Sequence, residues 1–100
     1  MDIKRDDKRV EVRLDGDLVS TVTDEVREEL KRVVAEGATV VSLDMAKTEV
    51  IDSIGLGLVI SLHNSLAKTG GSLSVINLSP DIQGLFRNMR LDRHFTVTGA

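Results

Sequence analysis

The chain has 100 residues, of which 41% are hydrophobic and 29% are charged, and its formal net charge is −3 at pH 7. This composition is typical of a globular protein with its own core, and we expect a single domain over residues 1–100. The chain contains no cysteine, which excludes disulfides, thiol nucleophiles and cysteine-based zinc sites. Its negative charge and its scarcity of aromatic residues, two in all, argue against a nucleic-acid partner.

No segment of the chain is typical of secretion or of membrane insertion. The N-terminal residues are highly charged and lack the apolar core of a signal peptide. The longest nearly apolar run, Ile54 to Leu62, is about half of the roughly 20 residues that a membrane-spanning helix needs. We therefore expect a cytoplasmic protein without a membrane partner.

The first strand pattern lies near the N-terminus. Residues 9–14 alternate between charged and apolar side chains, which is typical of a half-buried strand. Asp15-Gly16 favours a tight hairpin turn. Residues 17–20 are therefore expected to form a second strand that runs back beside the first.

A helix is expected from Thr21 to Glu36. Thr21 and Asp24 have the spacing of a capping box, and apolar residues recur at helical intervals until Gly37 ends the helix. Thr39 to Leu43 is β-branched and apolar, which is typical of a buried strand. Because this strand follows a strand and a helix, we expect a right-handed parallel crossover.

The most unusual stretch covers residues 50–57, Val-Ile-Asp-Ser-Ile-Gly-Leu-Gly, where Asp52 and Ser53 stand among apolar residues. Either side chain could accept hydrogen bonds from the free amides of a first helical turn. We therefore expect a helix from Ser53 to Thr69, with Gly70-Gly71 ending it.

Two sets of residues in this helix are expected to behave differently. One stripe at helical spacing should face the core and contains Gly55, Leu58, Val59, Leu62 and Leu66. Ile54, Leu56 and Ile60 lie outside this stripe. Unless the helix is covered all round, part of their apolar surface is expected to face outward, as in a patch that docks a partner. Gly55 and Gly57 each cost about 1 kcal/mol relative to alanine inside a helix, which indicates the close approach of a strand or a partner.

The C-terminal third continues the alternation. Residues 72–78 predict a strand, and Ser79-Pro80 is a strong helix start with serine as the cap and proline in the first turn. The following apolar stripe contains Ile82, Leu85, Phe86 and Met89. Phe95 and Val97 predict a weak edge strand.

The expected order is β-β-α-β-α-β-α-β, an α/β fold with a mixed sheet of four to five strands and helices packed against it. Such sheets place functional surfaces at strand C-termini and at the helix starts that follow them. This rule selects three places: residues 20–24, residues 44–57 and residues 79–81.

Enzyme chemistry finds little support in these residues. Ser53 lacks the preceding glycine of a hydrolase nucleophile elbow, because Ile51 occupies that position. Gly55-Leu56-Gly57 lacks the third glycine of a dinucleotide loop, and no Walker lysine follows. His63 and His94 have no partner at metal-ligand spacing and are expected to be surface or packing residues. We expect no catalytic residue, no metal and no cofactor.

Two roles stay open for Ser53. It could be the N-cap of its helix, or it could accept a phosphate. A phosphate at a helix N-terminus meets free amides and the positive end of the helix dipole. Its charge of about −1.5 to −2 would also oppose the burial of the neighbouring apolar residues under a partner.

The chain resembles the STAS domain family, and within it the single-domain anti-sigma factor antagonists of bacterial partner switching. The likeness covers nearly the whole chain. It rests on residues 50–57 with the helix that ends in Lys-Thr-Gly-Gly at 68–71, on Leu-Asp-Gly-Asp-Leu at 14–18, and on Ser79-Pro80 with Leu85-Phe86. The resemblance implies a STAS-like fold and a non-enzymatic regulator of transcription.

The resemblance also implies partners and a site. Ser53 would be phosphorylated by an anti-sigma factor that is also a serine kinase of the histidine-kinase-like ATPase type. A PP2C-type phosphatase would remove the phosphate, and the unphosphorylated protein would bind the anti-sigma factor and release sigma. The implied contact residues are Ser20, Thr21, Asp24, Asp52, Ile54, Gly55, Leu56 and Gly57. The alternative is a STAS scaffold or transporter-associated subunit in which Ser53 is only an N-cap.

Overall fold

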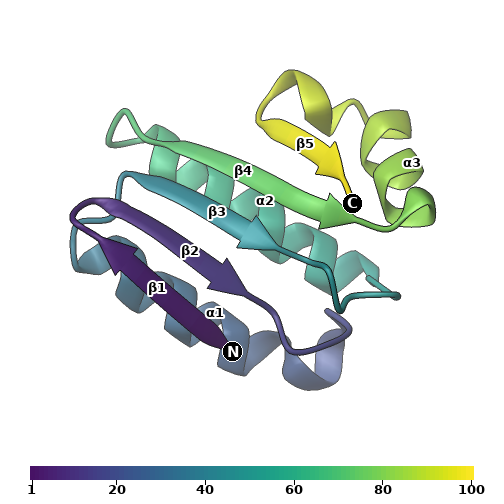
Figure 1. Ribbon diagram of the computed structural model, residues 1–100, viewed down its shortest axis with the longest axis horizontal. Coiled ribbons are helices and arrows are strands. Elements are labelled where there is room, and N and C mark those ends of the chain that lie inside the picture. The colour runs from purple at the N-terminus through teal and green to yellow at the C-terminus, as the bar shows by residue number, and fades with distance from the viewer.

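A five-stranded sheet with two long helices on one face organises the chain (Figure 1). The computed structural model describes residues 1–100. The strands are β1 (Asp2–Asp6), β2 (Arg9–Arg13), β3 (Val40–Asp44), β4 (Ser72–Leu78) and β5 (Thr96–Gly99). The helices are α1 (Ser20–Ala35), α2 (Ser53–Ala67) and α3 (Pro80–Asn88), followed by a 3-10 turn, η1 (Leu91–Arg93). The expected α/β fold with its β-β-α-β-α-β-α-β order is confirmed, although the first two strands are not the two predicted segments.

The strands lie in the sheet in the order in which they occur along the chain. β1 and β2 are antiparallel, whereas the pairs β2–β3, β3–β4 and β4–β5 are parallel. When successive crossovers between adjacent parallel strands have the same handedness, their helices lie on the same face of the sheet, as Figure 1 shows for α1 and α2. The C-terminal ends of β2 and β3, and the starts of both helices, therefore lie at one end of the sheet.

The N-terminal hairpin differs from the expected one. The predicted strand over residues 17–20 is wrong, because the partner of β2 is the preceding strand β1. The turn is formed around Asp7, which has a φ of 56°. Asp15-Gly16 instead continues from β2 towards α1. The alternation that usually reveals a strand is missing from β1, where every side chain except Ile3 is exposed.

Helix α1 begins without the predicted capping box. Its first residue is Ser20, and Val19 occupies the N-cap position without a side-chain hydrogen bond. Asp24 instead pairs with Arg27 at 3.0 Å on the helix surface. The helix ends as predicted before Gly37, whose φ of 101° favours glycine.

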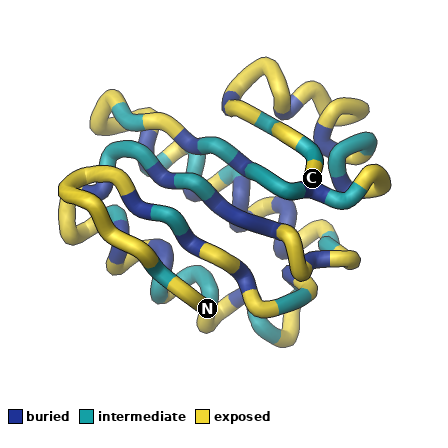
Figure 2. Tube along the Cα trace, in the orientation of Figure 1, coloured by how far each residue is buried: buried dark blue, intermediate teal, exposed yellow.

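The core lies between the sheet and the two long helices, where buried segments of the strands and of α2 face one another (Figure 2). The predicted core stripe of α2 is confirmed, since all five of its residues are buried. Leu56 is also buried, with 8% of its surface exposed, so its predicted exposure is wrong. This helix is covered over a wider arc than one stripe because it contacts both α1 and the sheet.

Helix α3 packs at the β5 edge and buries only part of its predicted stripe. Ile82 and Phe86 are buried, whereas Leu85 and Met89 are 37% and 47% exposed. Ser79 caps this helix as predicted, accepting from the Ile82 N–H at 3.3 Å. The predicted C-terminal edge strand is confirmed as β5. No helix has both the length and the apolar character required to cross a membrane.

Candidate functional site

The segment that leads into α1 runs beside the segment that leads into α2. The Leu18 N–H donates to the Val50 carbonyl at 3.0 Å, and the Leu18 carbonyl accepts from the Asp52 N–H at 3.3 Å. The Thr48 hydroxyl donates to the Gly16 carbonyl at 2.7 Å. These bonds form a short parallel pairing that continues past the ends of β2 and β3, and they hold the starts of α1 and α2 together.

Asp17 fixes the same pairing through its side chain. Its Oδ1 accepts from the N–H groups of Glu49 and Val50 at 2.9 and 3.0 Å. A residue expected to lie in a strand therefore acts as a clamp on the loop before α2. Two segments that are distant in sequence become one surface.

Asp52 joins the first turns of both helices. Its Oδ1 accepts from the Gly55 N–H at 2.7 Å, and its Oδ2 accepts from the Ser20 N–H at 2.8 Å. The Gly55 N–H, and next the Ser20 N–H, hold the pKa of Asp52 below its usual value of 3.8, because both bonds favour the ionised carboxylate. The charge also lies at the positive ends of two helix dipoles. One ionised carboxylate thus caps α2 and ties α1 to it.

Ser53 is the first residue of α2 and is exposed. The interpretation of Ser53 as the helix cap is wrong, because Asp52 occupies the N-cap position and supplies the cap bond. The structure gives the Ser53 hydroxyl no hydrogen-bond partner within the chain. The fold therefore leaves this hydroxyl open at the surface, next to the bridging carboxylate.

Two large apolar side chains close to Ser53 in the sequence are exposed. Ile54 is 51% exposed, as the sequence predicted, and Val50 is 53% exposed. Val50 is absent from the predicted contact residues because it lies in the loop, outside any helical pattern. The exposed large apolar residues of the 50–57 stretch are thus Val50 and Ile54, whereas Leu56 lies inside the fold.

The two glycines of the first turns differ in their surroundings. A Cβ on Gly55 would lie 2.1 Å from the Leu18 carbonyl oxygen, so Gly55 lets the segment before α1 approach α2. This confirms the predicted close approach, with an internal neighbour. A Cβ on Gly57 would meet nothing within 4 Å, and Gly57 is exposed.

The remaining predicted contact residues lie on the first turns of α1. Ser20, Thr21 and Asp24 are all exposed. Ser20 is joined directly to Asp52, so this part of α1 lies beside the start of α2. The structure brings the two predicted contact segments to one end of the molecule, with Gly55 and Leu56 as buried supports.

The two histidines, expected to be surface or packing residues, lie together at another place. The ring centroids of His63 and His94 are 6.1 Å apart, and the His63 ring is 5.4 Å from that of Phe95. No group of three or more metal-ligating side chains accompanies them. The sequence could not reveal this pair because one residue lies in α2 and the other follows η1.

A family model for the STAS domain matches residues 1–99. The chain belongs to the STAS domain family. The anti-sigma-B factor antagonist of Bacillus subtilis (strain 168) is 28% identical over 99 residues, which are 99% of this chain and 82% of that protein. The family expected from the sequence motifs is thus confirmed.

Several solved structures share the fold of this chain. SpoIIAA, an anti-sigma factor antagonist, matches in its unphosphorylated form with a TM-score of 0.79 and 22% identity, covering 99% of this chain and 87% of SpoIIAA. The phosphorylated form of SpoIIAA from Bacillus matches with a TM-score of 0.78 and 22% identity over 96% of this chain and 88% of that one. A sulfate transporter family protein from Wolinella succinogenes matches with a TM-score of 0.75 and 20% identity over 93% and 78% of the two chains.

Proposed function

We propose that this STAS domain is a cytoplasmic, non-enzymatic anti-sigma factor antagonist controlled by phosphorylation of Ser53. Unphosphorylated, it binds an anti-sigma factor that is also a serine kinase of the histidine-kinase-like ATPase type. Phosphorylation releases the protein from this anti-sigma factor. A PP2C-type phosphatase then removes the phosphate and so restores binding. The observation that carries the proposal is the exposed Ser53 hydroxyl, which the Asp52 cap leaves free of any structural bond.

The contact surface that we propose surrounds this hydroxyl. Ile54 and Val50 supply exposed apolar area, and the first turns of α1 supply Ser20, Thr21 and Asp24. An apolar patch bordered by polar groups is typical of a protein-binding surface. The similarity to the anti-sigma-B factor antagonist supports the choice of an anti-sigma factor as the partner.

Phosphate at Ser53 would act through desolvation and repulsion. It adds a charge of about −1.5 to −2 beside the ionised Asp52 and the exposed Ile54. Burying such a charge under a partner without a counter-ion costs several kcal/mol. Since each 1.4 kcal/mol is tenfold in affinity, a cost of about 3 kcal/mol weakens binding by about a hundredfold. The helix itself tolerates the phosphate because its N-terminal amides and dipole favour anions.

The first experiment maps the modification. The protein is incubated with ATP and the anti-sigma factor kinase of its own genome, and phosphate is located by mass spectrometry. We expect phosphate on Ser53 and none on Ser53→Ala. Phosphate on another residue of the wild-type protein would contradict the proposal.

The second experiment measures the binding of that kinase. Ser53→Asp should weaken binding by about tenfold or more, since it places a negative charge at the same position. Ser61→Asp is the matched control, because Ser61 is another exposed serine of α2 outside the proposed surface. Equal binding by wild type and Ser53→Asp would defeat the switch.

A second candidate function has one observation in its favour, the shared fold with a sulfate transporter family protein. In a transporter-associated subunit or an unphosphorylated scaffold, Ser53→Ala and Ser53→Asp would bind the partner equally well. The pair of variants therefore separates the two functions.

A further inference from the structure

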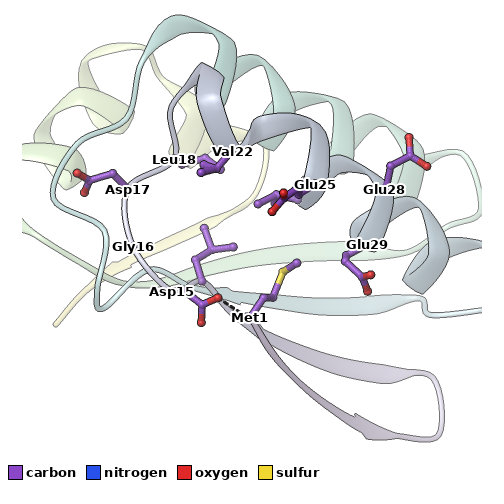
Figure 3. A pocket seen from close by; sticks show the side chains of 11 residues that line it. Met1, Asp15, Gly16, Asp17, Leu18, Val22, Glu25, Glu28 and Glu29 are labelled. Atoms are coloured by element: carbon purple, nitrogen blue, oxygen red, sulfur yellow. Dashed lines mark hydrogen bonds and ion pairs between the residues drawn. The ribbon is translucent and has the colours of Figure 1, made fainter.

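A groove that does not include Ser53 lies beside α1. It runs between α1, the start of β1 and the segment after β2, and its volume is about 860 Å³. Figure 3 shows Met1 facing α1, with Asp15 and Glu29 on either side of it. The groove has an apolar floor and an acidic rim.

The floor of the groove contains Leu14, Leu18, Val22, Val26 and Met1. Leu14 and Leu18 are buried, and Met1 and Val26 pack partly against the core. Val22 is half-buried and is not part of that core packing. The groove therefore leaves apolar surface accessible in a concave place, which is where an apolar anchor of a partner gains most from burial.

The rim carries five carboxylates: Asp15, Asp17, Glu25, Glu28 and Glu29. No lysine, arginine or histidine lines the groove. Asp15 pairs with the N-terminal ammonium group, and Glu29 pairs with Arg32 at 2.6 Å. Asp17, Glu25 and Glu28 form no ion pair. The rim thus keeps negative charge that a cationic ligand would neutralise.

The geometry of α1 indicates the shape of that ligand. Val22, Glu25, Val26 and Glu29 follow the helical spacing i, i+3, i+4 and i+7, so they form one stripe along the helix. A second helix that lies along this stripe would bury apolar residues in the floor and place lysines or arginines against the rim. Nucleic acids and anionic membranes would be repelled by the same carboxylates.

We propose that this groove binds a cationic amphipathic helix of a protein partner. The proposal goes beyond the phosphorylation switch and does not depend on it, because Ser53 is outside the groove. The two surfaces adjoin through Asp17 and Leu18, which line the groove and also hold the loop before α2. A protein bound at Ser53 could therefore extend a basic helix into the groove.

The test uses a synthetic peptide of about 15 leucine and lysine residues with the leucines on one helical face, a length at which an isolated helix begins to be stable. Binding to the full chain is measured by fluorescence anisotropy and by NMR shifts of the backbone amides. We expect the shifts to cluster at residues 14–18 and 22–29. Removing two rim charges with Glu25→Gln/Glu28→Gln should weaken binding by about fivefold, since each exposed ion pair contributes only modestly.

The matched control is Asp6→Asn/Asp7→Asn, which removes the same net charge at the far end of β1. Asparagine tolerates the positive φ of Asp7, so the turn is kept. This control should change the affinity for the peptide by less than about twofold, because it alters only the net charge of the protein and not the groove. A second control is a peptide with serine in place of leucine, which keeps the charge and should bind much more weakly.

Three results would overturn the proposal. They are no binding of the leucine-lysine peptide, an equal loss in the two double variants, and equal binding of the serine peptide. The last two would show general electrostatic attraction rather than a docking groove. Because no kinase is used, these outcomes are independent of the fate of the Ser53 proposal.

Discussion

At the scale of single residues, Asp52 is the side chain on which the candidate site depends. Asp52→Asn keeps one accepting oxygen but turns an amide group towards a backbone N–H, so one of the two bonds to Ser20 and Gly55 is lost. We expect the melting temperature to fall by a few degrees, and Asp52→Ala to lower it further because both bonds are lost.

Amide hydrogen exchange locates the effect of these variants. The Ser20 N–H should exchange faster in Asp52→Ala than in the wild type, because its partner is gone. The Val22 N–H, which donates to the Val19 carbonyl at 2.9 Å, is an internal reference and should change little. Unchanged protection of the Ser20 N–H in Asp52→Ala would show that the hydrogen bond between Ser20 and Asp52 does not stabilise the contact between the helices.

At the scale of elements, the packing of α2 against the preceding segment distinguishes its two glycines. In Gly55→Ala the new Cβ would collide with the Leu18 carbonyl oxygen, which is backbone and cannot rotate away. We expect a destabilisation of about 1–3 kcal/mol, as in other overpacked sites. Gly57→Ala is its control in the same helix and should stabilise by up to about 1 kcal/mol, because nothing surrounds that position.

Chemical denaturation of the two alanine variants measures this difference directly. Stabilisation by Gly55→Ala would mean that the segment before α1 moves away from the new methyl group at little cost, and that the site is not rigid. Destabilisation by Gly57→Ala would contradict the open surroundings of that glycine.

The sequence predicts elements well where one face is buried and poorly where none is. The stripe of α2 and the Ser79-Pro80 start of α3 carry strong local signals, and both are confirmed. β1 has almost no buried face, so periodicity could not reveal it. The Asp15-Gly16 turn signal was outweighed by pairing between segments that are distant in sequence.

The same division holds for the site. The local sequence marks residues 50–57 as unusual, and Ser53 is exposed there as the phosphoacceptor hypothesis requires. The double role of Asp52 could not be predicted, because its second donor, Ser20, lies on another helix. Val50 was missed for a different reason, since exposure in a loop has no periodic signal.

At the scale of the whole molecule, ionised carboxylates support the end of the sheet where the site lies. Asp44 ends β3, is buried, and accepts from the Ala46 N–H at 2.9 Å, with Arg13 at 3.4 Å. Burial raises the pKa of Asp44, but the Ala46 N–H, the Asn77 side chain and Arg13 outweigh it and hold the pKa below its usual value of 3.8. The Met1 ammonium group likewise holds the pKa of Asp15 below its usual value of 3.8.

These lowered pKa values determine how stability depends on pH. A carboxyl whose folded pKa is below its unfolded value stabilises the fold above the unfolded pKa, and this contribution is lost as pH falls through the folded pKa. We therefore expect wild-type stability to fall below about pH 4. Asp44→Asn should be destabilised at neutral pH, where it lacks the charged partner of Arg13, and should approach the wild type in acid. Urea unfolding from about pH 7 to about pH 3 measures both curves. A constant gap between them would show that the Asp44 charge does not stabilise the sheet, because only an ionisable contribution disappears on protonation.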